Sequence, residues 1–279
     1  MPGENVFEKQ DGMTESGIHY RVLRSATSKA PLVLTYGYGG NIGMWPVRLL
    51  ERLAEKFVVV CLDNRGAGQS VCPLVPTDYT VEIMADDVDA VVETLNLPEF
   101  HLLGYSLGGC IAIQYAAKHP DKVMSLFLLS TTGGGTLWSK PPEDQAAILK
   151  APQGDSLWDM YVSVWETTMS AEALKKYDST LRELFENSKA YITPNEALMG
   201  HLNAFRNFDG SDLVKNISVP VTIFCGADDR LITAQNSRNL ANQLPRAKHV
   251  QVENCEHYPH VEAQELLVSE IFALCSAAN

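Results

Sequence analysis

Ser106 is the residue of this 279-residue sequence whose surroundings point most directly to chemistry. It stands at the centre of Gly104-Tyr105-Ser106-Leu107-Gly108, between the apolar run Phe100–Leu103 and a helical stretch that includes Ile111. A serine in a tight turn from a buried strand to a helix is typical of an exposed nucleophile, and glycine fits where side chains would meet backbone. Leu107 opens the helix, so its free N–H favours negative charge nearby. An incidental serine in a strand-to-helix turn is the alternative.

A serine nucleophile needs a general base, and the base needs an acidic residue that orients it. Such side chains meet at the carboxyl ends of parallel strands. Among the seven histidines, His257 comes just past the last predicted strand and is the favoured base, with His260 as the alternative. Asp228 and Asp229 both follow the apolar run Val221–Cys225, and the residues alone do not separate them. Both could instead be ordinary turn carboxylates.

Apolar runs predict the strands that must position these residues. Beside the run before Ser106, they cover Gly17–Leu23, which we expect to be antiparallel, and Pro31–Tyr36, Phe57–Leu62, Val123–Ser130, Val221–Gly226 and His249–Val252. Helical spacing covers Trp45–Ala54, Val81–Leu95, the stretch after Ser106, Ser237–Leu244 and Val261–Ala273. Near-continuous apolar strands that alternate with helices predict an α/β fold with a mostly parallel central sheet flanked by helices on both faces.

The alternation of strands and helices stops between residues 132 and 217, where short helical patterns and no convincing strand are found. We therefore divide the chain into a core of residues 1–131 and 218–279 and an inserted helical cap, or lid, of residues 132–217. The cap holds Trp138, Trp158 and Trp165, and an aromatic layer over the strand ends would form an apolar pocket. These three tryptophans and Tyr36 are expected to line the substrate pocket.

Composition and charge argue against several classes of protein. The sequence has 34 acidic and 22 basic residues, and its net charge of -12 disfavours nucleic acid and anionic membrane surfaces as partners. No apolar run reaches the roughly 18 residues of a membrane-spanning helix, and no signal peptide is visible. The six cysteines show no zinc-ligand spacing and are expected to be reduced, in a cytoplasmic protein.

These motifs resemble those of the α/β-hydrolase fold family, in its small form with a helical cap. The resemblance covers about Gly17 to Phe272 and includes the chain order of serine, acid and histidine. The loop Asp63–Ser70 is similar to the family's Asp-x-Arg-Gly-x-Gly-x-Ser loop. The family's acid usually stands three residues after a glycine, and Gly226-Ala227-Asp228-Asp229 matches this spacing. The resemblance therefore implies Asp229 as the acid.

The resemblance also implies the two donors of an oxyanion hole. By matching positions, the backbone N–H of Tyr38 is the second donor beside that of Leu107. Two departures from the family pattern affect the same region. Tyr36 stands where the family usually has histidine, and Glu256 stands where it usually has glycine before the catalytic histidine. We expect the Glu256 side chain to point to solvent.

The expected activity is hydrolysis of a small or medium carboxylic ester, lactone or related acyl compound with an apolar portion. Ser106 would be the nucleophile, whereas dehalogenases and epoxide hydrolases of this fold use aspartate at that position. No metal or organic cofactor is expected. The Gly37–Gly40 loop is not expected to bind a dinucleotide, because it lacks the full glycine pattern with a following helix and ribose-binding acid. The alternatives are a lyase or cofactor-free perhydrolase with the same triad, and a ligand receptor that turns over little. The sequence leaves the oligomeric state open.

Overall fold

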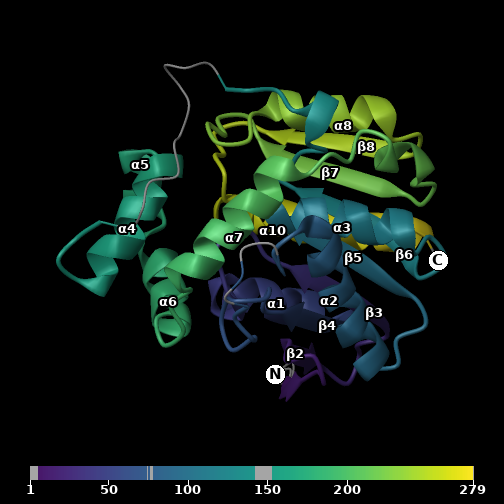
Figure 1. Cartoon of the computed structure of the whole chain (residues 1–279), viewed down its shortest axis with the longest axis horizontal. Helices are drawn as coiled ribbons and strands as arrows, with labels where there is room; N and C mark the ends of the chain where they lie inside the picture. Colours follow the sequence, from purple (N-terminus) through teal and green to yellow (C-terminus); the bar gives the residue numbers. More distant parts are fainter. Residues whose placement is uncertain (1–5, 74, 76–77, 142–152, 279) are drawn as a thin grey trace, which may run out of the picture.

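A computed structural model describes residues 6–73, 75, 78–141 and 153–278 of the chain (Figure 1). Its centre is an eight-stranded sheet in the order β1-β2-β4-β3-β5-β6-β7-β8. The strands are β1 (Glu8–Met13), β2 (His19–Arg24), β3 (Ala30–Thr35), β4 (Phe57–Leu62), β5 (Phe100–Tyr105), β6 (Val123–Leu129), β7 (Val221–Gly226) and β8 (Ala247–Val252). From β4 to β8 all neighbours are parallel, while β1 and β2 are antiparallel additions. The predicted α/β class and mostly parallel sheet are confirmed.

Alternate residues of the central strands face opposite sides of the sheet. In β3, Val33 joins one apolar cluster, whereas Leu32 and Leu34 join the other; in β5, Leu102 and Leu103 divide in the same way. Both faces are buried, which is why these strands appear in the sequence as continuous apolar runs.

Helices cover both faces of this sheet (Figure 1). The helices α2 (Val81–Thr94), α3 (Leu107–Lys118) and α8 (Ala234–Gln243) pack on one face. The helices α1 (Val47–Ala54) and α10 (Gln264–Ala278) pack on the other. The sheet and helices together hold the carboxyl ends of β3, β5 and β7 in fixed places, and those ends carry the predicted site residues.

Two elements differ from the sequence prediction. Strand β1 was not predicted, because its sequence Glu-Lys-Gln-Asp-Gly-Met has no apolar alternation; it is largely exposed and pairs with β2 at the sheet edge. The last predicted helix is two helices, a short α9 (Pro259–Glu262) and α10, with Ala263 between them out of helical conformation. Proline at the first position of α9 fits the start of a helix, where its missing N–H costs nothing.

The segment between β6 and β7 holds the inserted helices. They are η3 (Gly135–Leu137), α4 (Leu157–Thr168), α5 (Ala171–Lys176), α6 (Asp178–Ser188), α7 (Asn195–Asn207) and η4 (Leu213–Asn216). Figure 1 shows α4, α5 and α6 beside the sheet and α7 running back toward α3. Ala204, Phe208, Val214 and Ile217 share an apolar cluster with α2 and α3, so the end of this segment packs as part of the core. Residues 142–152 of the predicted cap lie outside the described residues.

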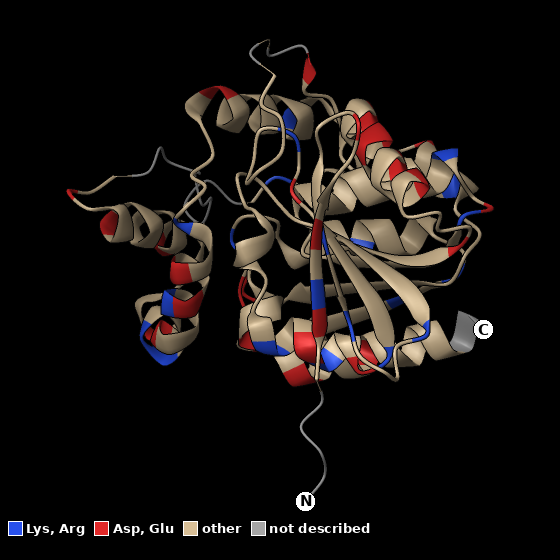
Figure 2. Cartoon of the chain, turned by 90° about the horizontal axis from the view of Figure 1, so that it is seen from below, with Lys and Arg blue, Asp and Glu red and all other residues tan. Residues whose placement is uncertain are grey.

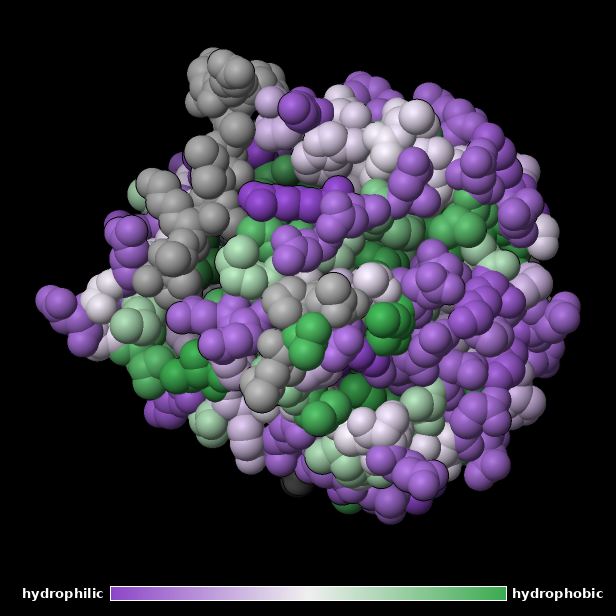
Figure 3. Space-filling model, viewed as in Figure 1, coloured by the Kyte–Doolittle hydropathy of each residue, from purple (hydrophilic) through white to green (hydrophobic). Residues whose placement is uncertain are grey.

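The described surface is mixed in polarity. Figure 2 shows acidic and basic residues interspersed over the outer helices. On the face in Figure 3, hydrophobic side chains reach the surface in small groups between hydrophilic ones. None of the helices in the described ranges combines the length and apolar character that crossing a membrane requires.

Candidate active site

The turn between β5 and α3 holds Ser106 in an unusual backbone conformation. Its φ is 54° and its ψ is -119°, and residues other than glycine rarely adopt a positive φ. The surrounding backbone fixes this geometry, because the Ser106 N–H donates to the carbonyl of Leu129 at 2.9 Å. The Ser106 carbonyl accepts from the Thr131 hydroxyl at 2.6 Å. The turn therefore stores strain that the end of β6 and the residues just after it hold in place.

The two flanking glycines are required by close backbone contacts. A side chain at Gly104 would collide with the carbonyl of Gly108, and one at Gly108 would collide with the carbonyl of Thr35 at the end of β3. The Gly-x-Ser-x-Gly spacing thus follows from the tight packing of α3 against the ends of two strands.

Asp229 and His257 are hydrogen-bonded to each other in the core. Asp229 lies three residues after the last residue of β7, and its Oδ2 is 2.8 Å from Nδ1 of His257. Its other oxygen, Oδ1, accepts from the N–H groups of Leu231 and Ile232, both at 2.9 Å. Since a carboxylate only accepts, His257 donates from Nδ1, and its Nε2 is left as an acceptor. Asp228, in contrast, is exposed.

The loop that carries His257 is fixed from both sides by Glu262. The carboxylate of Glu262 accepts from the N–H groups of Glu256 at 2.9 Å and Tyr258 at 3.0 Å, the two neighbours of His257. Burial raises the pKa of Glu262, and the two N–H donors oppose this. The prediction that Glu256 points to solvent was wrong, since its carboxylate accepts from the N–H of Ser170 at 2.6 Å. Ser170 caps α5, and a carboxylate there is favourable because a helix N-terminus is electropositive.

The loop after β3 is held by the inserted segment. His201 of α7 accepts from the N–H of Gly39 at 3.1 Å through Nδ1, so its Nε2, 2.9 Å from the carbonyl of Arg65, must be the donor. The Thr193 hydroxyl donates to the carbonyl of Gly39 at 2.7 Å. Sequence reasoning missed both residues, because their partners are backbone groups far away in the chain. Burial lowers the pKa of His201 to about 4, which keeps the ring neutral and able to accept.

The loop Asp63–Ser70 supports the same region. The Asp63 carboxylate accepts from the N–H of Ile42 at 2.7 Å and that of Gln69 at 3.0 Å. The side chain of Asn64 donates to the carbonyl of Tyr36 at 2.9 Å, immediately before the Gly37–Gly40 loop. In the part of the chain that the structure describes, no acceptor takes the N–H of Tyr38 or that of Leu107. Both N–H groups therefore lack a hydrogen-bond partner among the described residues.

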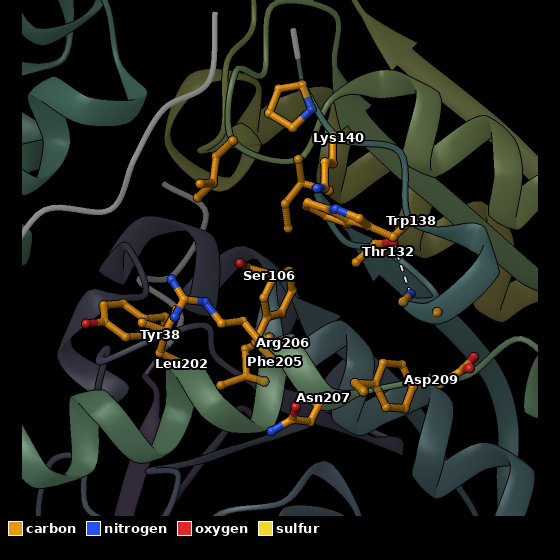
Figure 4. A pocket seen from close by; sticks show the side chains of 17 residues that line it. Tyr38, Ser106, Thr132, Trp138, Lys140, Leu202, Phe205, Arg206, Asn207 and Asp209 are labelled. Carbon is orange, nitrogen blue, oxygen red and sulfur yellow. Dashed lines mark hydrogen bonds between the residues drawn. The ribbon is translucent and has the colours of Figure 1, made fainter. Parts of the chain in front are cut away.

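A cavity of about 720 Å³ lies in front of Ser106 (Figure 4). Ser106, Leu107 and Tyr38 form part of its wall, and Leu231 and Ile232, whose N–H groups hold Asp229, form another part. The inserted segment adds Trp138 and the α7 residues Leu202, Phe205 and Arg206. Across residues 6–73, 75, 78–141 and 153–278, no group of three or more His, Cys, Asp or Glu side chains is arranged to hold a metal ion.

The family follows from a direct comparison. Residues 30–264 match the alpha/beta hydrolase fold family. The chain belongs to this family. It is 32% identical over 266 residues to a proline iminopeptidase of Lactobacillus acidophilus, a match that covers 88% of this chain and 89% of that protein.

Solved structures of the α/β-hydrolase fold superpose on nearly the whole chain. The esterase RhEst1 from Rhodococcus sp. ECU1013 has a TM-score of 0.78 at 23% identity, covering 97% of this chain and 99% of that one. The enol-lactonase from Burkholderia xenovorans LB400 has a TM-score of 0.79 at 21% identity, covering 96% of this chain and 100% of that one.

Tyr36, one of the departures from the usual α/β-hydrolase pattern, lies in the core and not on the cavity. It is 3% exposed, its ring packs edge-on against Trp45 at 4.9 Å, and its hydroxyl is 3.0 Å from Nε2 of His260. The expectation that Tyr36 lines the pocket was wrong, because the alternation of the strand turns its side chain away from the cavity. Tyr36 continues the alternation of Leu32 and Leu34, which face α1 and α10. The same contact places His260 in the core, where burial lowers its pKa to about 3.

The three cap tryptophans lie in different places in this α/β-hydrolase. Trp138 lines the cavity. Trp158 and Trp165 pack against each other within the α4–α6 group, with ring centroids 5.9 Å apart, and Trp165 is 1% exposed. The expectation that they line the pocket is therefore corrected, because they form the apolar core of the inserted helices. Beside Trp138, the inserted segment contributes Leu202 and Phe205 to the cavity wall, and neither was predicted as a pocket residue.

Proposed function

We propose that this chain is a serine hydrolase that cleaves a small or medium carboxylic ester, lactone or related acyl compound without a cofactor. The observation that carries the proposal is the strained Ser106 at a cavity wall that also includes Leu107 and Tyr38, whose N–H groups have no partner among the described residues. The buried pair of Asp229 and His257 supports it, since the loop after Asp229 lines the same cavity.

In the proposed mechanism, Ser106 Oγ attacks the carbonyl carbon while His257 Nε2 takes the hydroxyl proton. The proton then passes to the leaving group, and an acyl-enzyme forms on Ser106. Water attacks this acyl-enzyme with His257 again as the base, which releases the acid and restores the serine. Asp229 keeps the proton of His257 on Nδ1 and stabilises the imidazolium that forms.

The oxyanion of the tetrahedral intermediate would be bound by the N–H groups of Tyr38 and Leu107. One such donor is typically worth about 3–4 kcal/mol to the transition state. The Gly37–Gly40 loop needs a fixed shape for this role, and the hydrogen bonds of Thr193 and His201 to Gly39 provide it. The apolar residues of the cavity would receive the apolar portion of the substrate.

A labelling and turnover experiment tests the proposal. A fluorophosphonate probe should label the native protein at Ser106, and a panel of p-nitrophenyl esters and γ-lactones should show saturable turnover. Ser106→Ala should abolish labelling and lower kcat by at least about 10³-fold without changing the melting temperature, because only the nucleophile is removed. A variant that keeps a tenth of the native activity would contradict the assignment, and labelling without turnover of any substrate would favour a receptor.

A further inference from the structure

The cavity in front of Ser106 differs in charge from the protein as a whole. The chain has a net charge of -12, yet among the described residues the cavity is lined by two basic residues, Arg206 and Lys140, and one acidic residue, Asp209. A carboxylate oxygen of Asp209 accepts from the N–H of Ser211 at 3.0 Å. The described wall of the cavity therefore carries one more positive than negative side chain.

Arg206 is an arginine without a carboxylate partner among the described residues, as are Arg230, Arg238 and Arg246, but of these four only Arg206 lines the cavity. Arg21, Arg24 and Arg65 each form an ion pair with an acidic side chain. No ion pair involves Arg206 among the residues for which the structure gives positions. Its place in the last turn of α7 is favourable for a cation by itself. The residue is exposed, so water can solvate the guanidinium, and what distinguishes it is its place in the cavity wall.

Arg206 lines the same cavity as Tyr38, whose backbone N–H is one of the two proposed oxyanion donors. Leu202 and Arg206 are four residues apart on α7 and lie on one face of the helix, and both line the cavity. In the view of Figure 4, the guanidinium of Arg206 projects into the space between the labelled side chains of Tyr38 and Ser106. Burial raises the pKa of Tyr38, while the charge of Arg206 opposes this, so Arg206 acts on that hydroxyl electrostatically. Tyr38 stays protonated at neutral pH and can donate a hydrogen bond.

We propose that Arg206, together with the hydroxyl of Tyr38, binds a carboxylate of the substrate, so that the preferred acyl compounds carry an anionic end. This inference rests on the proposed function and narrows its substrate class. A guanidinium presents two parallel N–H groups that match the two oxygens of a carboxylate, which a lysine cannot do. Binding there would hold the substrate with its carbonyl near the N–H of Tyr38.

Two matched pairs of esters test the charge preference. In the first pair, the p-nitrophenyl half-ester of glutaric acid is compared with the p-nitrophenyl methyl diester of the same acid, so the carboxylate is on the acyl portion. In the second pair, the butyrate ester of 3-hydroxybenzoic acid is compared with that of methyl 3-hydroxybenzoate, so the carboxylate is on the leaving group. In at least one pair, kcat/KM should be about tenfold higher for the anion, which corresponds to about 1.4 kcal/mol. The preference should shrink in high salt.

Substitutions at Arg206 decide whether this residue sets the preference. Arg206→Gln should bring the ratio of the two kcat/KM values close to 1, and Arg206→Glu should make the neutral ester the better substrate. The control Arg48→Gln removes the same charge from α1, where the side chain is 76% exposed, and should keep the native ratio. A native enzyme without any charge preference would overturn the inference, and so would a preference that survives in Arg206→Gln.

Binding in the absence of turnover separates this inference from the proposed function. Titration calorimetry of glutarate with Ser106→Ala, and with the same variant carrying Arg206→Gln, measures the carboxylate site directly. We expect the second protein to bind glutarate at least about fivefold more weakly; equal affinities would overturn the inference. If the native protein hydrolyses no ester and its Ser106 is not labelled by the fluorophosphonate, the proposed function fails, while the glutarate comparison still decides the carboxylate site.

Discussion

Replacement of Asp229 by asparagine should make His257 unable to act as the base without disturbing the fold. The structure fixes how the new amide would lie, because Oδ1 of Asp229 accepts two backbone N–H groups, those of Leu231 and Ile232. The amide oxygen would keep these two bonds, and the amide nitrogen would then face Nδ1 of His257 across the present 2.8 Å contact. Two N–H groups cannot bond to each other, so the proton of His257 would move to Nε2. A protonated Nε2 cannot accept the proton of Ser106.

The opposite orientation of the amide is strongly disfavoured. It would point the amide nitrogen at the two backbone donors and leave both unsatisfied in a buried place, which costs about 1–3 kcal/mol for each donor. A penalty of at least about 2 kcal/mol leaves only a few per cent of molecules with the productive tautomer. Correct orientation of the imidazolium is lost as well, so we expect kcat to fall by about 10⁴-fold, or about 5.5 kcal/mol.

The assay compares kcat for p-nitrophenyl butyrate among the native enzyme, Asp229→Asn and Asp228→Asn, with thermal unfolding as the measure of fold. Asp228 is the matched control, because it is the adjacent carboxylate and is exposed. Its substitution should change kcat by less than about threefold, since a solvated surface charge contributes little. The reasoning is refuted if Asp229→Asn retains a hundredth of the native kcat, or if Asp228→Asn is the more damaging change.

Two further predictions concern pH and the inserted helices. Burial lowers the pKa of His201 to about 4, so the unfolded chain binds a proton that the folded chain does not between about pH 6.5 and 4. The free energy of unfolding should therefore fall as the pH is lowered through this window, by up to about 1.4 kcal/mol per pH unit for this group, and His201→Gln should reduce that slope; equal slopes in urea titrations would contradict the prediction. Trp138→Ala should change the preferred acyl length, because the ring lines the cavity. The discrimination between acyl lengths, measured as the ratio of kcat/KM values, should shift by a few kcal/mol at most. Trp165 is 1% exposed, so Trp165→Ala should instead lower the free energy of unfolding by about 3–5 kcal/mol and leave the acyl preference unchanged. The opposite result, with acyl preference changed by Trp165→Ala and stability lowered by Trp138→Ala, would contradict the assignment of Trp138 to the cavity and Trp165 to the core.

The sequence by itself determined the features that depend on neighbouring residues. The continuous apolar run of β5, the glycines around Ser106 and the helical stretch after it predicted the strand, the turn and the helix, because each is a local property of the backbone. The parallel sheet followed from the alternation of such runs with helices. The edge strand β1 escaped prediction for the same reason, since its polar sequence has no local pattern and depends on pairing with β2.

Only the tertiary structure decided which side chains meet across the chain. The hydrogen bond from Gly39 to His201 joins residues 162 positions apart, and that from Ser170 to Glu256 joins residues 86 positions apart. Likewise, the sequence shows that aromatic residues are abundant in the inserted segment, but not which of them reach the cavity. Trp138 does so and Trp165 does not, because burial depends on how whole helices pack. Periodicity fixes the face on which a side chain lies, whereas the partner on that face is set by elements that come together only when the chain folds.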